Sequence, residues 1–263
     1  MFNKTIDFDK YSSIKIGGVK TICIVQNIDE ALKLINENYS IIGKVNNVLI
    51  NPNARNLIQL GKEFDYIKDY GSYIEVGAMC STRKVFLYFR DNNLGGIEFL
   101  GSLPGSIGGA VKMNAGMKKF EIKDTIISVL INDRWVDSND INFKYRNSNI
   151  DGIIFAVRLK KSNSFNYELE NIFKQMRLNQ PNLPSCGSCF KNPPIEPAGL
   201  LLDKAGLKGI QIGGMAFSKK HANFLVNMGY GKFQDAISLI DLAKKSVLKK
   251  FNICLELEII TIN

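Results

Sequence analysis

A glycine-rich stretch constrains this chain more than any other part of its sequence. Residues 94–116 contain seven of the chain's 22 glycines, at positions 95, 96, 101, 105, 108, 109 and 116. Glycine at this density predicts a backbone that turns repeatedly or lies close against a ligand. Several free main-chain N–H groups in such a segment form a concavity that binds anions and suits a pyrophosphate. Two tight turns would need fewer glycines, so the stretch favours a ligand-binding loop.

Apolar runs and amphipathic segments alternate around this stretch and predict an α+β fold. Strands are expected at residues 20–26, 39–42, 73–78, 126–132, 152–160 and 253–262, and helices at 28–37, 82–92, 167–178, 198–205 and from a cap at Asp235 to Phe251. In the last strand, Leu255, Leu257 and Ile259 share one face, whereas Glu256 and Glu258 lie on the other.

Composition and missing motifs exclude several classes of protein. The net charge of +9 favours anionic partners such as nucleotides, but only seven of the 34 basic residues are arginines, which argues against nucleic acid as a partner. No apolar segment reaches the ~18 residues of a membrane span. Neither a P-loop nor a Rossmann glycine motif is present. The single histidine excludes a His-rich metal site, and no metal is expected. Five cysteines without a signal peptide predict a reducing, cytoplasmic location.

The segment Cys186-Gly187-Ser188-Cys189 is open to a thiol-based interpretation. Its C-x-x-C pattern could be a redox dithiol, but it lacks the second ligand pair of a zinc site. It also approaches the signature of papain-like proteases, which places a histidine ~130–150 residues downstream. Here His221 follows Cys189 by 32 residues (221 − 189). Incidental cysteines around a functional Gly-Ser pair are favoured, and a thiol-dependent oxidoreductase or hydrolase that uses Cys186 or Cys189 stays open as the alternative.

Several strings, taken in order, resemble one known family. They are Gly96–Ala110 with Met113-Asn114-Ala115-Gly116, Tyr145-Arg146-Asn147-Ser148, Pro184–Pro193 with its Gly-Ser-Cys-Phe-Lys-Asn-Pro core, Ala205–Gly209, His221-Ala222-Asn223-Phe224 and Leu255–Ile259. Together they resemble the UDP-N-acetylenolpyruvoylglucosamine reductases, the MurB family, over nearly the whole chain. The short length resembles the family's compact subtype.

The resemblance implies a three-part α+β flavoenzyme. Residues 1–65 would form a small α/β N-terminal lobe together with the C-terminal strand 253–263. Residues 66–175 would form a second FAD-binding domain of the vanillyl-alcohol-oxidase/MurB type, and residues 176–257 an α+β substrate domain. The protein is then expected to act as a monomer on small molecules, without insertion into a membrane.

The resemblance also implies the reaction and the residues that carry it. NADPH and non-covalently bound FAD would reduce UDP-N-acetylglucosamine enolpyruvate to UDP-N-acetylmuramate in peptidoglycan synthesis. Arg146, Ser188 and Glu258 would be the catalytic residues, with Arg146 at the substrate carboxylate and Ser188 as the proton donor. A flavin-binding module without turnover is a second alternative.

Two further sets of residues follow from the same resemblance. The cofactor-binding residues would be Gly43, Asn46, Asn47, Leu49, Gly101, Pro104, Gly105, Ser106, Gly108, Gly109, Asn114, Ala115, Gly116 and Arg146. The substrate-binding residues would be Lys191, Asn192, Lys208 and His221. One departure from the family lies in the first set, because Gly43-Lys44-Val45-Asn46-Asn47 stands where the family usually has Gly-x-Gly-Ser-Asn. Val45 adds a side chain where the main chain would approach the pyrophosphate.

Overall fold

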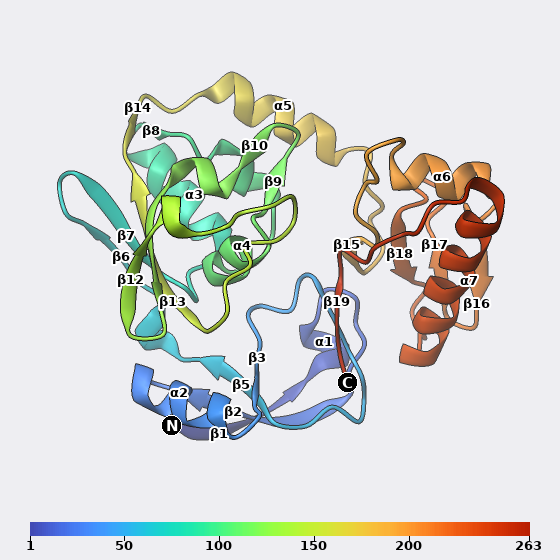
Figure 1. The fold of residues 1–263 in the computed structure, drawn as a ribbon, viewed down its shortest axis with the longest axis horizontal. Helices are drawn as coiled ribbons and strands as arrows, with labels where there is room; N and C mark the ends of the chain where they lie inside the picture. Colours follow the sequence, from blue (N-terminus) through green and yellow to red (C-terminus); the bar gives the residue numbers. More distant parts are fainter. The chain divides into compact units, whose positions relative to one another are not determined.

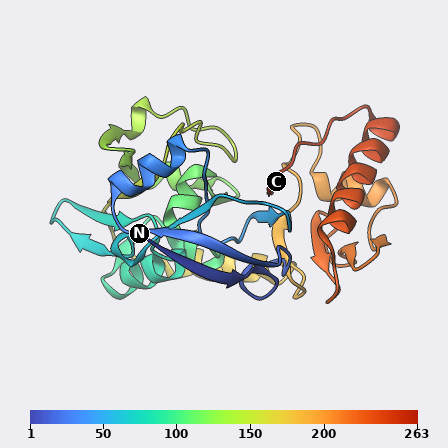
Figure 2. The same ribbon diagram turned by 90° about the horizontal axis from the view of Figure 1, so that it is seen from below.

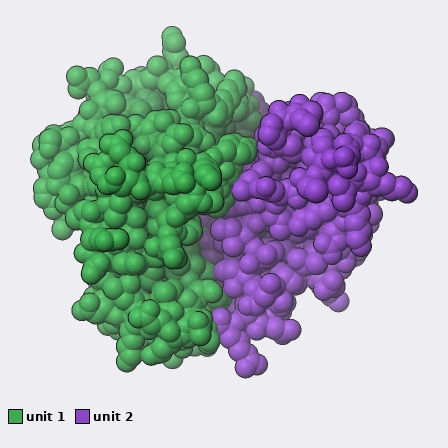
Figure 3. Space-filling view, viewed as in Figure 1, with its two compact units in different colours: residues 1–4, 21–44, 56–177 green, residues 5–20, 45–55, 178–263 purple.

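The computed structural model describes residues 1–263, and the chain forms two compact units, which are coloured separately in Figure 3. Unit 1 comprises residues 1–4, 21–44 and 56–177, and unit 2 comprises residues 5–20, 45–55 and 178–263. The three-part division expected from the resemblance stays a prediction. No helix combines the length and the apolar composition needed to cross a membrane.

A four-stranded sheet with the order β1-β2-β5-β3 begins the chain. Its strands are β1 (Phe2–Asp7), β2 (Val19–Val25), β3 (Ser40–Ile41) and β5 (Leu57–Leu60). Both β2 and β3 run parallel to β5. Helix α2 (Ile28–Asn36) follows β2, and it begins where the Asn27 side chain accepts a hydrogen bond from the Glu30 N–H. Figure 2 shows β1 and β2 as an extended pair.

A five-stranded antiparallel sheet, β12-β11-β13-β7-β6, forms the framework of unit 1. Its strands are β6 (Ile67–Asp69), β7 (Tyr73–Gly77), β11 (Ile126–Ile131), β12 (Arg134–Asp137) and β13 (Ile154–Lys160). Helix α4 (Ile107–Lys112) packs against β13 and β7, and Figure 1 shows α3 (Thr82–Asp91) on the same side of the sheet. Unit 1 also contains β8 (Leu94–Gly95), β9 (Gly116–Met117), β10 (Phe120–Glu121), β14 (Ser162–Asn163) and α5 (Tyr167–Arg177).

Unit 2 gathers three distant segments of the chain around one apolar core. Its antiparallel sheet has the order β15-β18-β17-β16, with β15 (Ser185–Ser188), β16 (Gln211–Ile212), β17 (Met215–Phe217) and β18 (Phe224–Asn227). Helix α7 (Phe233–Phe251) packs on β16 and β17, and α6 (Ala198–Lys204) contacts α7. The core also buries Ile14 and Ile16, which follow α1 (Phe8–Tyr11), and Leu49 of β4 (Val48–Ile50). Strand β4 pairs in parallel with β19 (Ile260–Ile262).

Two expectations about the C-terminal region are wrong in detail. Only Ile260–Ile262 of the expected last strand is a strand, because the main chain before it bonds to the loop after β15 instead of to a sheet. The expected alternation survives, since Leu255 and Ile259 are buried and Glu256 is exposed. Helix α7 begins at Phe233, so Asp235 is its third residue rather than its cap. The Asp235 carboxylate accepts a hydrogen bond from the Lys232 N–H, as in a capping box.

Asn223 holds the loop after β15 in place. Its side-chain oxygen accepts a hydrogen bond from the Phe190 N–H at 2.9 Å, and its side-chain nitrogen donates one to the Phe190 carbonyl at 2.8 Å. Its main-chain carbonyl also accepts from the Cys189 N–H at 2.7 Å. The Asn223 side chain is buried, so no water can replace it as a partner for Phe190.

We expect Asn223→Ala to destabilise unit 2, because both polar main-chain groups of Phe190 lose their partner in a buried place. Each unsatisfied group costs about 1–3 kcal/mol, so the free energy of unfolding should fall by at least about 2 kcal/mol. Urea unfolding measures the loss, and hydrogen exchange should be faster in a peptide that contains Phe190. Asn182→Ala, at an exposed position, is the matched control. Equal stability of the two variants would contradict the role of Asn223.

Candidate active site

Ser188 and Glu258 are brought together within unit 2. Ser188 is the last residue of β15, where it pairs with Phe224. The carbonyl of the next residue, Cys189, accepts a hydrogen bond from the Glu258 N–H at 2.9 Å, and Phe190 forms an antiparallel bridge with Leu257. Two of the three expected catalytic residues, 70 positions apart in sequence (258 − 188), therefore lie on adjoining main-chain segments.

Asn47 connects an expected cofactor loop to this pair. Its side-chain nitrogen donates to the Glu258 carbonyl at 2.9 Å, and its own carbonyl accepts from the Ile260 N–H at 2.9 Å. The neighbouring Asn46 donates from its side chain to the Ser13 hydroxyl at 2.6 Å. Leu49 lies in β4 with its side chain fully buried in the core of unit 2. The structure thus gives Asn47 a definite task, which is to hold the main chain at Glu258.

Val45 occupies an unusual backbone conformation. Its φ angle is 53°, in the left-handed region that a β-branched side chain rarely adopts, and its side chain is buried. This is the position at which the family usually has glycine. The conformation suited to glycine is therefore kept here although the residue is valine.

Arg146 belongs to unit 1, and its guanidinium group has two contacts there. Its Nη2 donates to the Gly116 carbonyl at 2.9 Å, and the group lies 4.8 Å from the centre of the Tyr145 ring. The side chain is partly exposed. A guanidinium group is a permanent cation with a planar set of N–H donors, a geometry that suits a carboxylate.

The glycines of the glycine-rich stretch lie in different local structures, and close packing requires at least one of them. Gly101 lies in a 3₁₀ turn, Pro104 and Gly105 precede α4, and Gly108 and Gly109 lie within it. A Cβ atom on Gly116 would lie 2.2 Å from the Phe120 carbonyl oxygen, so this glycine is required by the β9–β10 pairing. Ala115 follows Asn114 and donates its N–H to the Ala110 carbonyl.

Gly43 and Gly109 both lie beside the Ser106 hydroxyl, and we call these three residues the cradle. Ser106 caps α4, and its hydroxyl accepts from the Gly109 N–H at 3.3 Å. A Cβ atom on Gly43 would lie 2.6 Å from the same oxygen, and one on Gly109 would lie 3.3 Å from it. Two expected cofactor segments, 63 residues apart (106 − 43), therefore meet at Ser106 with glycine on both sides. A side chain at Gly43 would clash with this hydroxyl and one at Gly109 would crowd it, so the close approach of the two segments depends on glycine.

The expected substrate-binding residues divide into paired lysines and two polar side chains with structural contacts. The ammonium groups of Lys191 and Lys208 contact the carboxylates of Glu256 at 3.2 Å and Asp203 at 3.0 Å. Both pairs are partly exposed to solvent and therefore weak, so an anionic ligand can compete for the lysines. The Asn192 side-chain oxygen accepts from the Ala198 N–H at 3.0 Å, at the start of α6.

His221 is half-buried beside Phe224, with the ring centres 5.0 Å apart. Its Nδ1 accepts from the Asn223 N–H at 3.3 Å. Burial lowers the pKa of His221, and the nearby positive charge of Lys208 lowers it further, against the effect of a backbone hydrogen bond. The structure thus places His221 and Lys208 close enough to interact, and it keeps the imidazole neutral at pH 7.

The two cysteines beside Ser188 are core residues. The Cys186 thiol donates to the Val48 carbonyl at 3.2 Å, and burial raises its pKa to about 12. Cys189 is fully buried, and burial raises its pKa as well, with further contributions from Cys186 and Glu258. All five cysteines are free, and no cluster of side chains suitable for a metal is present.

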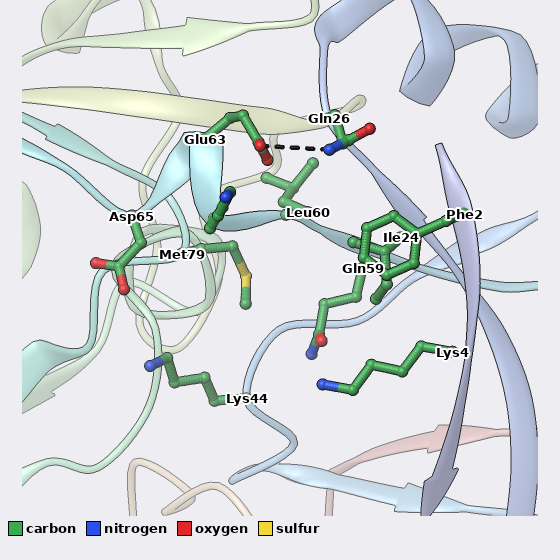
Figure 4. A pocket seen from close by; sticks show the side chains of 12 residues that line it. Phe2, Lys4, Ile24, Gln26, Lys44, Gln59, Leu60, Glu63, Asp65 and Met79 are labelled. Carbon is green, nitrogen blue, oxygen red and sulfur yellow. Dashed lines mark hydrogen bonds between the residues drawn. The ribbon is translucent and has the colours of Figure 1, made fainter.

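Sequence analysis missed a pocket of about 420 Å³ in unit 1. In Figure 4, Lys4, Lys44 and Gln59 lie along one side of it, and the Gln26 amide donates to the Glu63 carboxylate on the other, at 3.4 Å. Apolar side chains of Ile24, Leu60 and Met79 also line it. Gln59 links it to the cradle, because its side-chain nitrogen donates to the Gly43 carbonyl at 2.7 Å. The lining residues come from five separate segments, so no local motif could reveal the pocket.

Known proteins resemble this chain along its whole length. Residues 179–262 match the family described as UDP-N-acetylenolpyruvoylglucosamine reductase, C-terminal domain. UDP-N-acetylenolpyruvoylglucosamine reductase of Helicobacter hepaticus is 50% identical over 254 residues, which cover 97% of each chain. The Helicobacter pylori (strain 26695) protein of the same name is 46% identical over 259 residues, or 98% of each chain.

A solved structure agrees with these relatives. The crystal structure of UDP-N-acetylenolpyruvylglucosamine reductase (MurB) from Thermus caldophilus superposes with a TM-score of 0.87 at 28% identity, and the match covers 100% of both chains. The shared α+β fold therefore extends over both units. With half of its residues identical to those of a full-length relative, this chain belongs to the UDP-N-acetylenolpyruvoylglucosamine reductase family.

Proposed function

We propose that this protein is an FAD-dependent oxidoreductase that uses NADPH to reduce UDP-N-acetylglucosamine enolpyruvate to UDP-N-acetylmuramate, a step of peptidoglycan synthesis. The observation that carries this proposal is the 50% identity to a UDP-N-acetylenolpyruvoylglucosamine reductase over 97% of both chains. The proposal includes action as a monomer in the cytoplasm, without nucleic acid as a partner. The five free cysteines support a reducing compartment.

The residues of the cradle fit a bound dinucleotide. Gly43 and Gly109 both lie close to the Ser106 hydroxyl, so each position favours glycine, and glycine-rich main chain of this kind suits the approach of a pyrophosphate. Bound FAD would supply the relay of a hydride from NADPH to the substrate. The side chains of Leu49 and Asn114 are fully buried, so any contact of these two residues with the cofactor comes from their main chain.

The catalytic residues supply what the substrate's chemistry needs. Addition of a hydride to the terminal carbon of the enolpyruvyl group moves negative charge toward the carboxylate. Arg146 stabilises that charge because its guanidinium group is a permanent cation with two parallel donors. Ser188 then donates its hydroxyl proton to the adjacent carbon, which is strongly basic at that stage. Glu258 acts at the same carboxylate, and its main-chain bond to Cys189 keeps it near Ser188.

The remaining residues would hold the substrate's diphosphate and sugar. Lys191 and Lys208 can exchange their solvent-exposed carboxylate partners for phosphate oxygens. His221 stays neutral and serves as a hydrogen-bonding group rather than a charge. The side-chain oxygen of Asn192 accepts a hydrogen bond from the Ala198 N–H at the start of α6, so a ligand would be bound by its side-chain nitrogen.

The proposed function predicts a yellow protein with two separable half-reactions. FAD should bind in one equivalent and leave completely on acid precipitation, because no cysteine or histidine lies in the glycine-rich stretch to attach it. NADPH should bleach the flavin absorbance near ~450 nm, and the enolpyruvyl substrate should restore it. A flavin that NADPH reduces but the substrate does not reoxidise would leave a flavin-binding protein with a different acceptor.

Ser188→Ala should separate the half-reactions. Reduction by NADPH needs no acid and should survive, whereas reoxidation by the enolpyruvyl substrate should slow at least about a hundredfold, as loss of a general acid typically does. Stopped-flow absorbance follows each step. Cys186→Ala is the control, since Cys186 contributes packing and one hydrogen bond to the Val48 carbonyl but no proton to the substrate, and Ser188→Cys should recover part of the rate. Normal reoxidation by Ser188→Ala would remove Ser188 from the catalytic residues.

The thiol-based alternative finds no support in the cysteines' surroundings. Burial raises the pKa of Cys186 to about 12, so its thiol stays protonated at pH 8. We therefore expect iodoacetamide to modify the exposed Cys254 first in the native protein and to leave Cys186 and Cys189 intact. Mass spectrometry of peptides measures this, with urea-unfolded protein as the control. Rapid modification of Cys189 together with loss of turnover would favour the alternative.

A further inference from the structure

Arg146 lies in a tight turn that its own side chain does not favour. Lys144 and Asn147 face each other, with the Lys144 N–H donating to the Asn147 carbonyl at 2.7 Å and the Asn147 N–H to the Lys144 carbonyl at 3.1 Å. Tyr145 and Arg146 connect them, and Arg146 has a φ of 54°. Glycine or asparagine usually occupies such a position in a turn. The surrounding structure must therefore hold the turn in this shape.

Asn114 holds one side of the turn. It is fully buried, and its side-chain nitrogen donates to the Lys144 carbonyl at 3.0 Å and to the Glu121 carboxylate at 3.0 Å. Its side-chain oxygen accepts from the Lys123 N–H at 3.3 Å. A carboxylate and a carbonyl only accept hydrogen bonds, and an N–H only donates, so these partners fix which end of the amide is the nitrogen.

Ser148 holds the other side. Its main-chain N–H and its hydroxyl both donate to the Lys112 carbonyl, at 3.1 and 3.0 Å. The Arg146 guanidinium itself donates to the Gly116 carbonyl. One short segment thus binds the turn at three points: Asn114 before Arg146, Gly116 at Arg146 and Lys112 after it.

We propose that Asn114, together with Ser148, is a positioning residue for Arg146, because its side-chain amide fastens the turn that presents the guanidinium group. This inference rests on the proposed catalytic role of Arg146. It assigns the Asn114 side chain to the protein's own main chain rather than to the cofactor. The fixed turn limits the directions in which the guanidinium group can point, which is what bidentate binding of a carboxylate requires.

A double-mutant cycle tests the proposal in the FAD-loaded enzyme. Asn114→Ala should slow reoxidation by the enolpyruvyl substrate by about tenfold or more, as expected when a catalytic group is displaced by a fraction of an ångström. Flavin content and reduction by NADPH should match those of the unchanged protein. In an Arg146→Ala background the same substitution should add almost nothing, because the group that it positions is gone. An equal slowing in both backgrounds would overturn the proposal.

Asn132→Ala is the matched control for loss of stability. Asn132 also has a positive φ, 55°, and its side-chain oxygen accepts from the Ile153 N–H at 3.0 Å, in a loop away from Arg146. The Asn132→Ala variant should lower the free energy of unfolding without changing the rate of either half-reaction. If Asn114→Ala does not fold, Ser148→Ala takes its place in the cycle, since it removes the hydroxyl bond to Lys112 and the weak bond that the hydroxyl accepts from the Ile150 N–H at 3.4 Å, and leaves the Ser148 N–H bond to Lys112 in place. Equal rates for this variant and the unchanged enzyme would then overturn the proposal.

If the proposed catalytic role of Arg146 is wrong, the experiment gives a result that differs from failure of the positioning role of Asn114. If Arg146→Ala alone reoxidises at the normal rate, Arg146 has no catalytic role, whatever Asn114 does. Hydrogen exchange in a peptide that contains residues 144–148 reports the fastening separately from activity. Faster exchange in Asn114→Ala than in Asn132→Ala supports the fastening, and equal exchange in the two variants contradicts it.

Discussion

The hydrogen bond from the Glu258 N–H to the Cys189 carbonyl joins the two segments on which the candidate site of unit 2 depends. Several neighbouring main-chain groups on the Cys189 side are also hydrogen-bonded. Cys189 and Phe190 bond to Asn223, and the Lys191 N–H donates to the Glu256 carbonyl at 2.9 Å. Main-chain hydrogen bonds therefore hold the segments of Ser188 and Glu258, the proposed proton donor and carboxylate, side by side.

Asparagine performs the same physical task in both units. Asn223 bonds to both polar groups of Phe190, and Asn114 bonds to Lys144, Glu121 and Lys123. An amide side chain is short, uncharged and able to donate and accept, so it can satisfy irregular main chain in a buried place without the cost of burying a charge. Catalytic segments that are neither helix nor strand need such partners, because no regular ladder satisfies their N–H and carbonyl groups.

Periodic patterns predicted the regular elements well. Helices α2, α3, α5 and α6 and strands β11 and β13 lie within one or two residues of their expected ranges, because each has an apolar face of helical or strand period and a clear end signal. The last strand was overestimated, since alternation at 253–259 reflects burial against a loop. Asp235 was misplaced by one turn because a third-position acid and a cap look alike in sequence.

The candidate site shows a different limit of prediction from sequence. The residues themselves came from the resemblance, and the burial alternation around Glu258 could be read from the chain. The partners of Asn114 and Asn223 could not, because a hydrogen bond between a side chain and a distant main-chain group leaves no periodic trace. The glycine count was also ambiguous, since Gly116 serves a close main-chain contact whereas Gly43 and Gly109 belong to the cradle.

The pairing of β19 with β4 has a consequence for how the chain is made. Unit 2 needs residues 5–20 and 45–55 and also Ile260–Ile262, which are synthesised 212 residues after β4 begins (260 − 48). At about 5–20 residues per second, roughly 10–40 s separate the synthesis of β4 from that of β19. Throughout that interval Ile14, Ile16 and Leu49 have no finished core to enter. A nascent chain that stops before Glu258 also lacks the strand that closes this core, so termination there removes a residue proposed to be catalytic together with the folded unit.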